Sequence, residues 1–158
     1  EYILVYQLHD NKKFDKYAKE FSKKTGLKLL RISPSIYHIT RSGKLIYLPN
    51  QYEFLSLFQN AEYILTDSFH ATVFSHIFER PFVVSGKKEN EMGCRLKSLT
   101  DMFNTQSHYF VDHEMVTVNK IDEFDCELQI CDNITYKRMK EISINFLKMV
   151  INDGQFDL

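Results

Sequence analysis

The residues best suited to chemistry lie in the segment TDSFH, which begins at Thr66 and leads into an almost wholly apolar stretch. We expect a strand to end near Thr66 and a helix to begin at Ser68 or Phe69. Asp67 or Ser68 would then cap that helix. The first backbone N–H groups of a helix have no internal partner and carry the positive end of its dipole, so they favour an anion. His70 falls in this first turn, where a bound anion would favour the protonated imidazole.

Spacing alone favours a plainer interpretation, a capped helix whose His70 is merely half exposed, because strand–turn–helix junctions rarely carry chemistry. His76 lies six residues further on, about 600° of helix rotation away, so we expect it to face away from His70 at the edge of the core. His9 and Asp10 follow the first predicted strand at its carboxyl end, so they could line a cleft there, although a plain loop is the simpler expectation for them. The other histidines share no metal-like spacing with carboxylates: His38, His108 and His113.

The elements that would position TDSFH alternate along the chain. Strands are predicted over 2–8, 27–32, 62–66 and 81–84, and helices over 14–26, 50–61, 68–79, 92–103 and 133–152. Segment 36–49 is ambiguous between a loop and an irregular pairing, and 112–132 is expected to be a solvated connector. This order predicts an α/β fold, a Rossmann-like parallel sheet with flanking helices. Ligands of such sheets bind outside the carboxyl ends of the strands, which is where TDSFH lies.

Composition excludes several classes of protein. The chain has 158 residues, enough for one domain with a hydrophobic core. Its net charge of -1 gives no overall electrostatic attraction to nucleic acid or an anionic membrane. No apolar run approaches the roughly 20 residues of a membrane span. Its 3 cysteines have no metal-ligand spacing, which fits a reducing, cytoplasmic compartment. A strand begins directly after Glu1, so we interpret the chain as part of a longer protein.

An ordered set of short motifs runs from residue 44 to residue 103. It comprises Phe54-Leu55, Ala61, Thr66-Asp67, Ser68-Phe69-His70, Ala71, Pro81-Phe82, Arg95, Leu96 and Leu99. The order and spacing resemble the C-terminal half of the polysaccharide pyruvyl transferase family. In that family a Phe-Leu helix precedes Thr-Asp, a histidine tripeptide, an apolar helix and a Pro-led strand. No single motif is specific, but the ordered set is.

The resemblance implies two Rossmann-like domains, similar to GT-B glycosyltransferases, with the active site in the cleft between them. Residues 1–132 would be the donor-binding domain, and 133–158 a C-terminal helix that crosses to a missing N-terminal domain. The implied reaction moves pyruvyl from phosphoenolpyruvate onto two hydroxyls of a saccharide or lipid-linked saccharide as a ketal, in surface polysaccharide biosynthesis. His70 would be the catalytic residue that contacts the donor. We expect no cofactor, metal, nucleic acid or membrane span, and no activity from this domain alone.

The expected substrate-binding residues are Asp67, Ser68, Phe69, Arg95 and Lys87. Some family members carry an arginine where this chain has Ser68, so the charge that grips the donor must come from elsewhere. Arg95 is one candidate, because its fork suits a carboxylate or phosphate. Lys87 is another, although lysines in a polar loop are more often simply solvated.

Two other classes of protein stay open on the sequence. The first is the donor-binding domain of a nucleotide-sugar glycosyltransferase with the same architecture. Such domains hold the ribose with a glutamate near a helix start, and Asp67 is the nearest equivalent here. The second is a non-enzymatic module similar to a response regulator. It would need paired acidic residues after the first strand, where this chain has His9 and Asp10.

Overall fold

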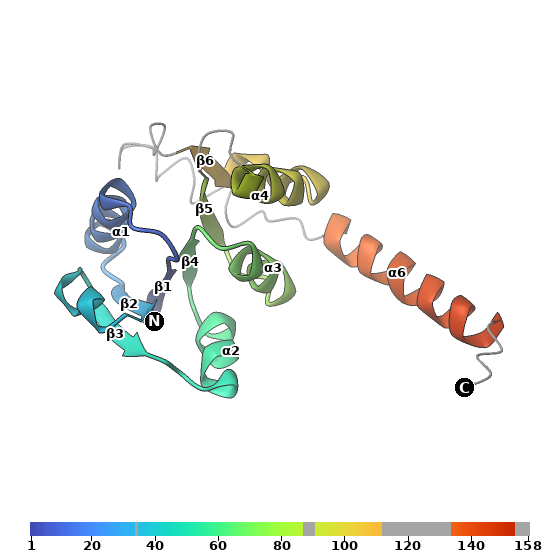
Figure 1. Ribbon diagram of the computed structural model, residues 1–158, viewed down its shortest axis with the longest axis horizontal. Helices are drawn as coiled ribbons and strands as arrows, with labels where there is room; N and C mark the ends of the chain where they lie inside the picture. Colours follow the sequence, from blue (N-terminus) through green and yellow to red (C-terminus); the bar gives the residue numbers. More distant parts are fainter. Residues whose placement is uncertain (34, 87–90, 112–133, 154–158) are drawn as a thin grey trace.

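Residues 1–33, 35–86, 91–111 and 134–153 are described by the computed structural model of the chain (Figure 1). The strands are β1 Tyr2–Tyr6, β2 Lys28–Ser33, β3 Lys44–Tyr47, β4 Tyr63–Thr66, β5 Phe82–Gly86 and β6 Tyr109–Val111. The α-helices are α1 Lys12–Thr25, α2 Gln51–Gln59, α3 Phe69–Ile77, α4 Glu91–Met102 and α6 Ile134–Asp153. Two 3₁₀ turns join them, η1 Ile36–Thr40 and η2 Gln106–His108.

All six strands run parallel in one sheet with the order β3-β2-β1-β4-β5-β6. The order reverses between β1 and β4, and we call this place the switch point. Strand β1 pairs with β4 so that Leu4 lies beside Ile64 and Tyr6 beside Thr66. Because parallel strands end at the same edge, the loops after β1 and β4 leave the sheet side by side. The predicted Rossmann-like α/β fold is confirmed.

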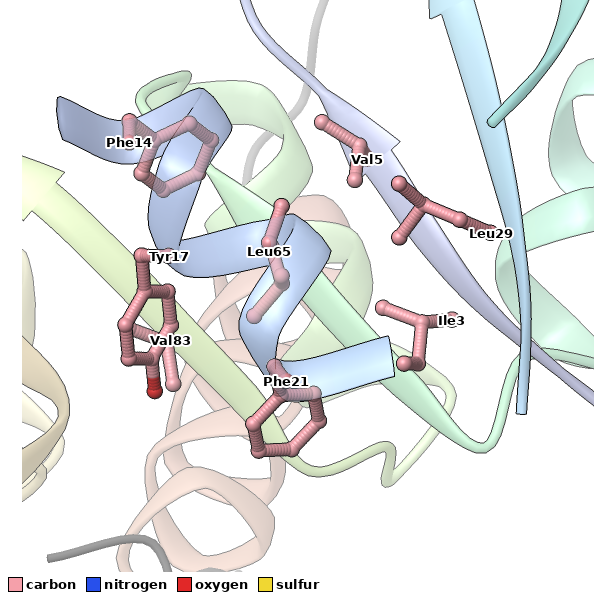
Figure 2. Close-up of a cluster of buried hydrophobic side chains, with 9 residues drawn as sticks. Ile3, Val5, Phe14, Tyr17, Phe21, Leu29, Leu65 and Val83 are labelled. Carbon is pink, nitrogen blue, oxygen red and sulfur yellow. The ribbon is translucent and has the colours of Figure 1, made fainter. Parts of the chain in front are cut away.

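Helices cover both faces of the sheet, because alternate strand residues point to opposite sides. On one face, α1 packs its buried aromatic residues against the sheet (Figure 2). That cluster contains Ile3, Val5, Phe14, Tyr17, Ala18, Phe21, Leu29, Leu65 and Val83. On the other face, residues of α2, α3 and α4 cover the sheet. That cluster contains Leu4, Ile32, Phe58, Ala61, Ile64, Ala71, Phe82, Val84 and Leu96.

The ambiguous segment 36–49 contains η1 and the edge strand β3. Gly43 makes the turn into β3 with φ +99°, and a Cβ there would lie 2.7 Å from Leu29 O, so glycine is required. The sequence did not predict β6, and it left β3 open as a loop or an irregular pairing. These edge strands, β3 and β6, have 4 and 3 residues, none of them buried, so their apolar runs are too short to mark a strand. The predicted connector 112–132 lies outside the described residues.

The prediction for His76 is wrong, because this residue is buried rather than at the edge of the core. It is 3% exposed, and its ring lies 4.9 Å from that of Phe82 and 4.6 Å from that of Phe103. Helix α3 contacts α2, α4 and the sheet, so its side chains are covered over a wide arc. A helix covered on several sides buries residues that one-sided packing would leave at the boundary.

Helix α6 is attached to the rest of the fold near its N-terminus and then extends away from the sheet (Figure 1). The Tyr136 ring stacks on His76 at 6.2 Å, and Lys137 Nζ lies 2.9 Å from a Glu79 carboxylate oxygen. Further along the helix large apolar side chains are exposed: Ile142, Ile144, Phe146, Leu147, Met149 and Ile151. The predicted long helix is therefore confirmed, with much apolar surface uncovered.

A charged side chain, Arg31 of β2, is buried within this fold at 1% exposure. Its Nη1 donates to Gln7 Oε1 at 2.8 Å, and its Nη2 lies 2.7 Å from Asp15 Oδ1 at the start of α1. The Asp15 contact is an ion pair without hydrogen-bond alignment, and Arg31 Nε has no acceptor within the described residues. Burial lowers the pKa of the guanidinium, and the Asp15 carboxylate opposes this shift. Arg31 therefore depends on Asp15.

Replacement of Asp15 by alanine should destabilise the chain by about 2 to 4 kcal/mol, because it leaves a buried guanidinium without its counter-charge. Glu20→Ala is the matched control on the same helix. Glu20 pairs with Lys16 at 3.8 Å on the exposed surface, where such pairs contribute about 0.3–0.5 kcal/mol. Urea unfolding curves measure both variants. Equal losses would show that Arg31 does not depend on Asp15.

Stability should also fall in mild acid because of His108, which is 3% exposed beside the Phe82 ring. Burial, with a smaller contribution from His76, lowers its pKa to about 4 from 6.5. Below pH 6.5 the unfolded chain binds a proton at His108, whereas the folded chain does so only near pH 4. The free energy of unfolding should therefore fall by at most about 3 kcal/mol across that window.

His108→Gln removes this titration, so the pH dependence between 6.5 and 4 should flatten in urea unfolding measured at several pH values. The matched control is Gln106→Ala, an exposed change in the same 3₁₀ turn, which should keep the wild-type slope. An unchanged slope in His108→Gln would assign the acid sensitivity to another group.

Candidate active site

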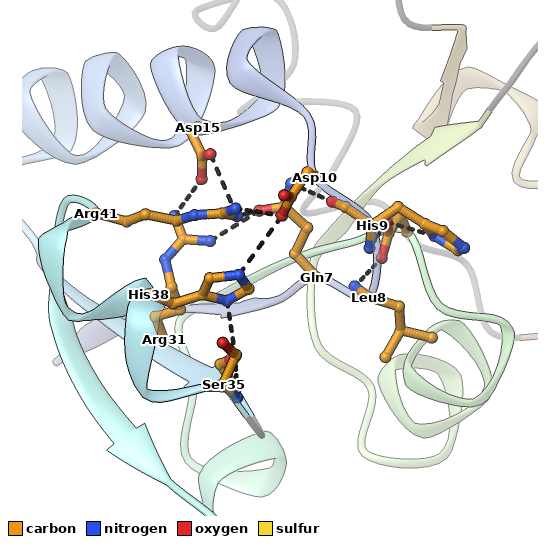
Figure 3. Close-up of polar contacts among 11 residues, drawn as sticks. Gln7, Leu8, His9, Asp10, Asp15, Arg31, Ser35, His38 and Arg41 are labelled. Atoms are coloured by element: carbon orange, nitrogen blue, oxygen red, sulfur yellow. Dashed lines mark hydrogen bonds and ion pairs between the residues drawn. The ribbon is translucent and has the colours of Figure 1, made fainter.

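The candidate site lies at the switch point, where β1 and β4 end. Strand β1 continues into residues 7–10, which we call the β1 loop, and β4 continues through Asp67 and Ser68 into α3. Figure 3 shows Leu8 and His9 in the β1 loop. In open parallel sheets this position is the usual place for a ligand, because the two diverging loops leave a crevice between them.

The Asp67 carboxylate joins the two loops. Its Oδ1 accepts a hydrogen bond from Leu8 N at 2.6 Å, and its Oδ2 accepts one from His9 N at 2.9 Å. The ring Nδ1 of His9 lies 3.0 Å from Asp67 Oδ2. The Asp67 side chain is 11% exposed. Both carboxylate oxygens are therefore engaged by protein donors, a partnership that spacing along the chain did not predict.

Ser68 is the N-cap of α3, which is one of the two caps, Asp67 or Ser68, that the sequence predicted. Its backbone is extended, its hydroxyl accepts from Ala71 N at 3.5 Å, and it is 2% exposed. Thr66 supports it, since Thr66 Oγ1 accepts from Ser68 N at 3.0 Å and donates to Tyr6 O at 2.6 Å. The hydroxyl of Ser68 therefore serves the helix start. This role of Thr66 depends on its contact with Tyr6, 60 residues away, which spacing along the chain does not predict.

His70 is exposed in the first turn of α3, directly after Phe69. The two rings meet edge to face at 5.8 Å, and Phe69 itself packs against the core. Within the described residues, neither Phe69 N–H nor His70 N–H has a hydrogen-bond acceptor. An exposed imidazole therefore stands beside two free amides at the positive end of a nine-residue helix.

The other predicted binding residues are less closely placed. Arg95 is exposed on α4, whereas Leu96 and Leu99 of the same helix are buried. In the part of the chain that the structure describes, Arg95 makes no hydrogen bond or ion pair. Lys87 lies outside the described residues. The geometry therefore gathers Asp67, Ser68 and His70, while Arg95 stands on a different helix.

A second polar group lies next to the site, after β1 and β2, and the sequence did not predict it (Figure 3). Arg41 contacts the Asp10 carboxylate, and this contact holds the pKa of Asp10 below its usual range. His38 bridges the same group, with Nδ1 2.7 Å from Ser33 Oγ and Nε2 3.5 Å from Asp10 Oδ1. These residues come from separate loops, so their meeting had no signal in the sequence.

The charge of Asp67 also affects the end of β1. Burial raises the pKa of Tyr6, and the nearby Asp67 carboxylate raises it further.

Across the described part of the chain, no three His, Cys, Asp or Glu side chains lie close enough to hold a metal ion. The described helices also include none that is long and apolar enough to cross a membrane.

Comparison with known proteins places the chain in a family. The family model for polysaccharide pyruvyl transferases matches residues 1–86, which is more than half of the 158-residue chain. The match spans β1 to β5, so it includes Asp67, Ser68 and His70 but stops before Arg95. No curated protein has a sequence that matches the chain. Because this match covers more than half of its residues, the chain belongs to the polysaccharide pyruvyl transferase family.

Proposed function

We propose that the protein transfers the pyruvyl group of phosphoenolpyruvate onto two hydroxyls of a saccharide, which forms a cyclic ketal. The observation that carries this function is the exposed His70 at the open start of α3, at the switch point and inside the segment that matches the family. A family of transferases needs a place for its donor. This is the described place that combines free amide donors with a group able to move a proton.

The chemistry of the donor suits this arrangement. Phosphoenolpyruvate carries a carboxylate and a phosphate, so it favours amide N–H groups at the positive end of a helix. Its methylene carbon must gain a proton to become the methyl group of the ketal. His70 is the proposed catalytic residue, since an exposed imidazole can donate a proton to a bound substrate.

We assign the rest of the donor site to the residues expected from the sequence: Asp67, Ser68, Phe69, Arg95 and Lys87. The contacts favour different roles within this set. Asp67 and Ser68 have their polar side chains engaged by the protein, so they support the site by holding its loops. Phe69 would offer its amide. Arg95 is exposed and unpaired among the described residues, which leaves its guanidinium available for the donor's phosphate or carboxylate.

Catalysis in this proposal takes place between two Rossmann-like domains in the cytoplasm, on a saccharide or lipid-linked saccharide of a surface polysaccharide. Residues 1–132 would form the donor-binding domain, and α6 would cross to the other domain. The exposed apolar side chains of α6 support this role, because such a surface is normally covered by a partner. An isolated donor domain would lack the second wall and should be inactive.

The rival functions gain no support from the contacts. A nucleotide-sugar transferase would need a free carboxylate for the ribose, but both oxygens of Asp67 are engaged by Leu8 and His9. A response-regulator module would need free acidic residues after β1. Asp10, the acidic residue there, is paired with Arg41.

His70→Ala in the full-length protein should lower kcat at least about 100-fold, because a positioned acid–base group contributes this much or more. The melting temperature should stay unchanged, since the His70 side chain is exposed. Ketal formation from phosphoenolpyruvate is followed by phosphate release and by proton NMR of the new methyl group. The control is Glu62→Gln, an exposed residue at the amino end of β4. Near-normal turnover in His70→Ala would remove His70 from the mechanism.

Arg95→Lys should raise KM for phosphoenolpyruvate although the charge is kept, because lysine lacks the bidentate fork. Arg95→Ala should raise it further. Lys97→Ala is a matched control, since Lys97 is an exposed cation on the same helix. Donor binding measured by calorimetry checks the result. If both Arg95 variants bind the donor as wild type does, Arg95 is not part of the donor site.

A further inference from the structure

We propose that His9, oriented by Asp67, is the base that takes the proton of the saccharide hydroxyl that attacks the donor. This role rests on the proposed function, because it assigns a second proton-transfer group to the same reaction. It adds a residue that spacing along the chain had suggested to be part of a plain loop. Four features of the structure carry it: the geometry of the His9–Asp67 pair, the exposure of His9, the contacts that hold the loop, and the position of His9 at the same edge of the sheet as His70.

The geometry selects one tautomer of His9. An ionised carboxylate can only accept hydrogen bonds, and Asp67 Oδ2 lies 3.0 Å from His9 Nδ1. The hydrogen of the neutral ring is therefore on Nδ1, and Nε2 keeps its lone pair. A carboxylate that orients an imidazole in this way also stabilises the imidazolium that forms when the ring takes a proton.

The side chains of His9 and Asp67 differ in their exposure to solvent. The His9 side chain is 32% exposed, whereas the Asp67 side chain is 11% exposed. Within the described residues, Nε2 of His9 makes no hydrogen bond or ion pair. His38 differs, because both of its ring nitrogens contact other side chains. His9 therefore combines an oriented ring with a second nitrogen that no described group engages.

The β1 loop is held from the side opposite Asp67 as well. Gln7 Nε2 donates to His9 O at 2.7 Å, and Gln7 Oε1 accepts from the buried Arg31 at 2.8 Å. Gln7 is 2% exposed. The backbone of His9 is thus fixed by a chain of contacts that ends in the core, and its side chain is fixed by Asp67. A catalytic group needs this kind of positioning.

The placement of His9 complements that of His70. Tyr6 and Thr66 lie side by side at the ends of β1 and β4. His9 follows Tyr6 by three residues and His70 follows Thr66 by four, so both imidazoles leave the same edge from neighbouring strands. The reaction needs a donor of the proton to carbon and an acceptor of the hydroxyl proton, and two imidazoles at one edge can divide these roles.

The proton transfers balance. His70 gives a proton to the methylene carbon of phosphoenolpyruvate, and the double-bond electrons form the new C–H bond. The first hydroxyl oxygen bonds to C2 and loses its proton to His9 Nε2. The C2–O bond to phosphate then breaks, the second hydroxyl oxygen takes its place, and its proton leaves with the phosphate. Exchange with solvent returns His70 to the protonated form and His9 to the neutral form.

The decisive variant is His9→Asn in the full-length protein, because the asparagine amide can still donate to Asp67 but cannot take a proton. It is assayed with phosphoenolpyruvate and a panel of methyl hexopyranosides as acceptors, by phosphate release and the NMR signal of the ketal methyl group. We expect kcat to fall at least about 100-fold, with KM for phosphoenolpyruvate unchanged. Glu62→Gln, at the opposite edge of the sheet, should keep wild-type turnover. Wild-type turnover in His9→Asn would show that His9 only holds the loop.

A second variant distinguishes a loss of catalysis from a loss of folding. His9→Ala should regain turnover when imidazole is added, and a purely structural role would give no such rescue. Nitrogen-15 NMR of the wild type should show hydrogen on Nδ1 of His9, and hydrogen on Nε2 would overturn the assignment. A wild type that forms no ketal refutes the proposed function itself. A wild type that forms ketal, together with an active His9→Asn, refutes the role of His9 alone.

Discussion

The Asp67 carboxylate is the contact on which the site depends. Parallel pairing brings the ends of β1 and β4 together, but pairing stops at Tyr6 and Thr66, so the next backbone groups need other partners. Asp67 supplies them, because it accepts from two amides of the β1 loop. Loss of this carboxylate would leave those donors and the His9 ring unpaired. One side chain therefore fixes the loop after β1 from the start of α3.

The start of α3 shows what a serine at position 68 does that an arginine there could not do. The hydroxyl of Ser68 accepts from Ala71 N and so completes the helix cap, which a guanidinium cannot do because it has no acceptor. Ser68 is also buried, where an arginine would need a carboxylate partner. The cap thus leaves the amides of Phe69 and His70 as the fixed positive group at this edge, and any further cation must come from another element.

The buried Arg31 has a function that stability alone does not explain. A guanidinium in the core is costly, and its Nε has no acceptor within the described residues. In return it joins the N-terminus of α1 to the β1 loop through Asp15 and Gln7. Apolar residues in its place could pack as well, but they could not hold a polar loop at the end of a strand. Arg31 therefore connects the core and the start of α1 to the β1 loop.

Local features of the sequence determined the main architecture and the helix start. Apolar periodicity predicts β1, β2, β4 and β5, and the small polar residues before an apolar helix predict a cap at Asp67 or Ser68, because both depend on neighbours along the chain. The motif around His70 also indicated the family, which the match over 1–86 confirms. Tertiary structure alone decided the pairing of His9 with Asp67, 58 residues apart. It also decided the burial of Arg31 and the edge strands, because such contacts depend on which strands become neighbours, and spacing along the chain carries no record of that.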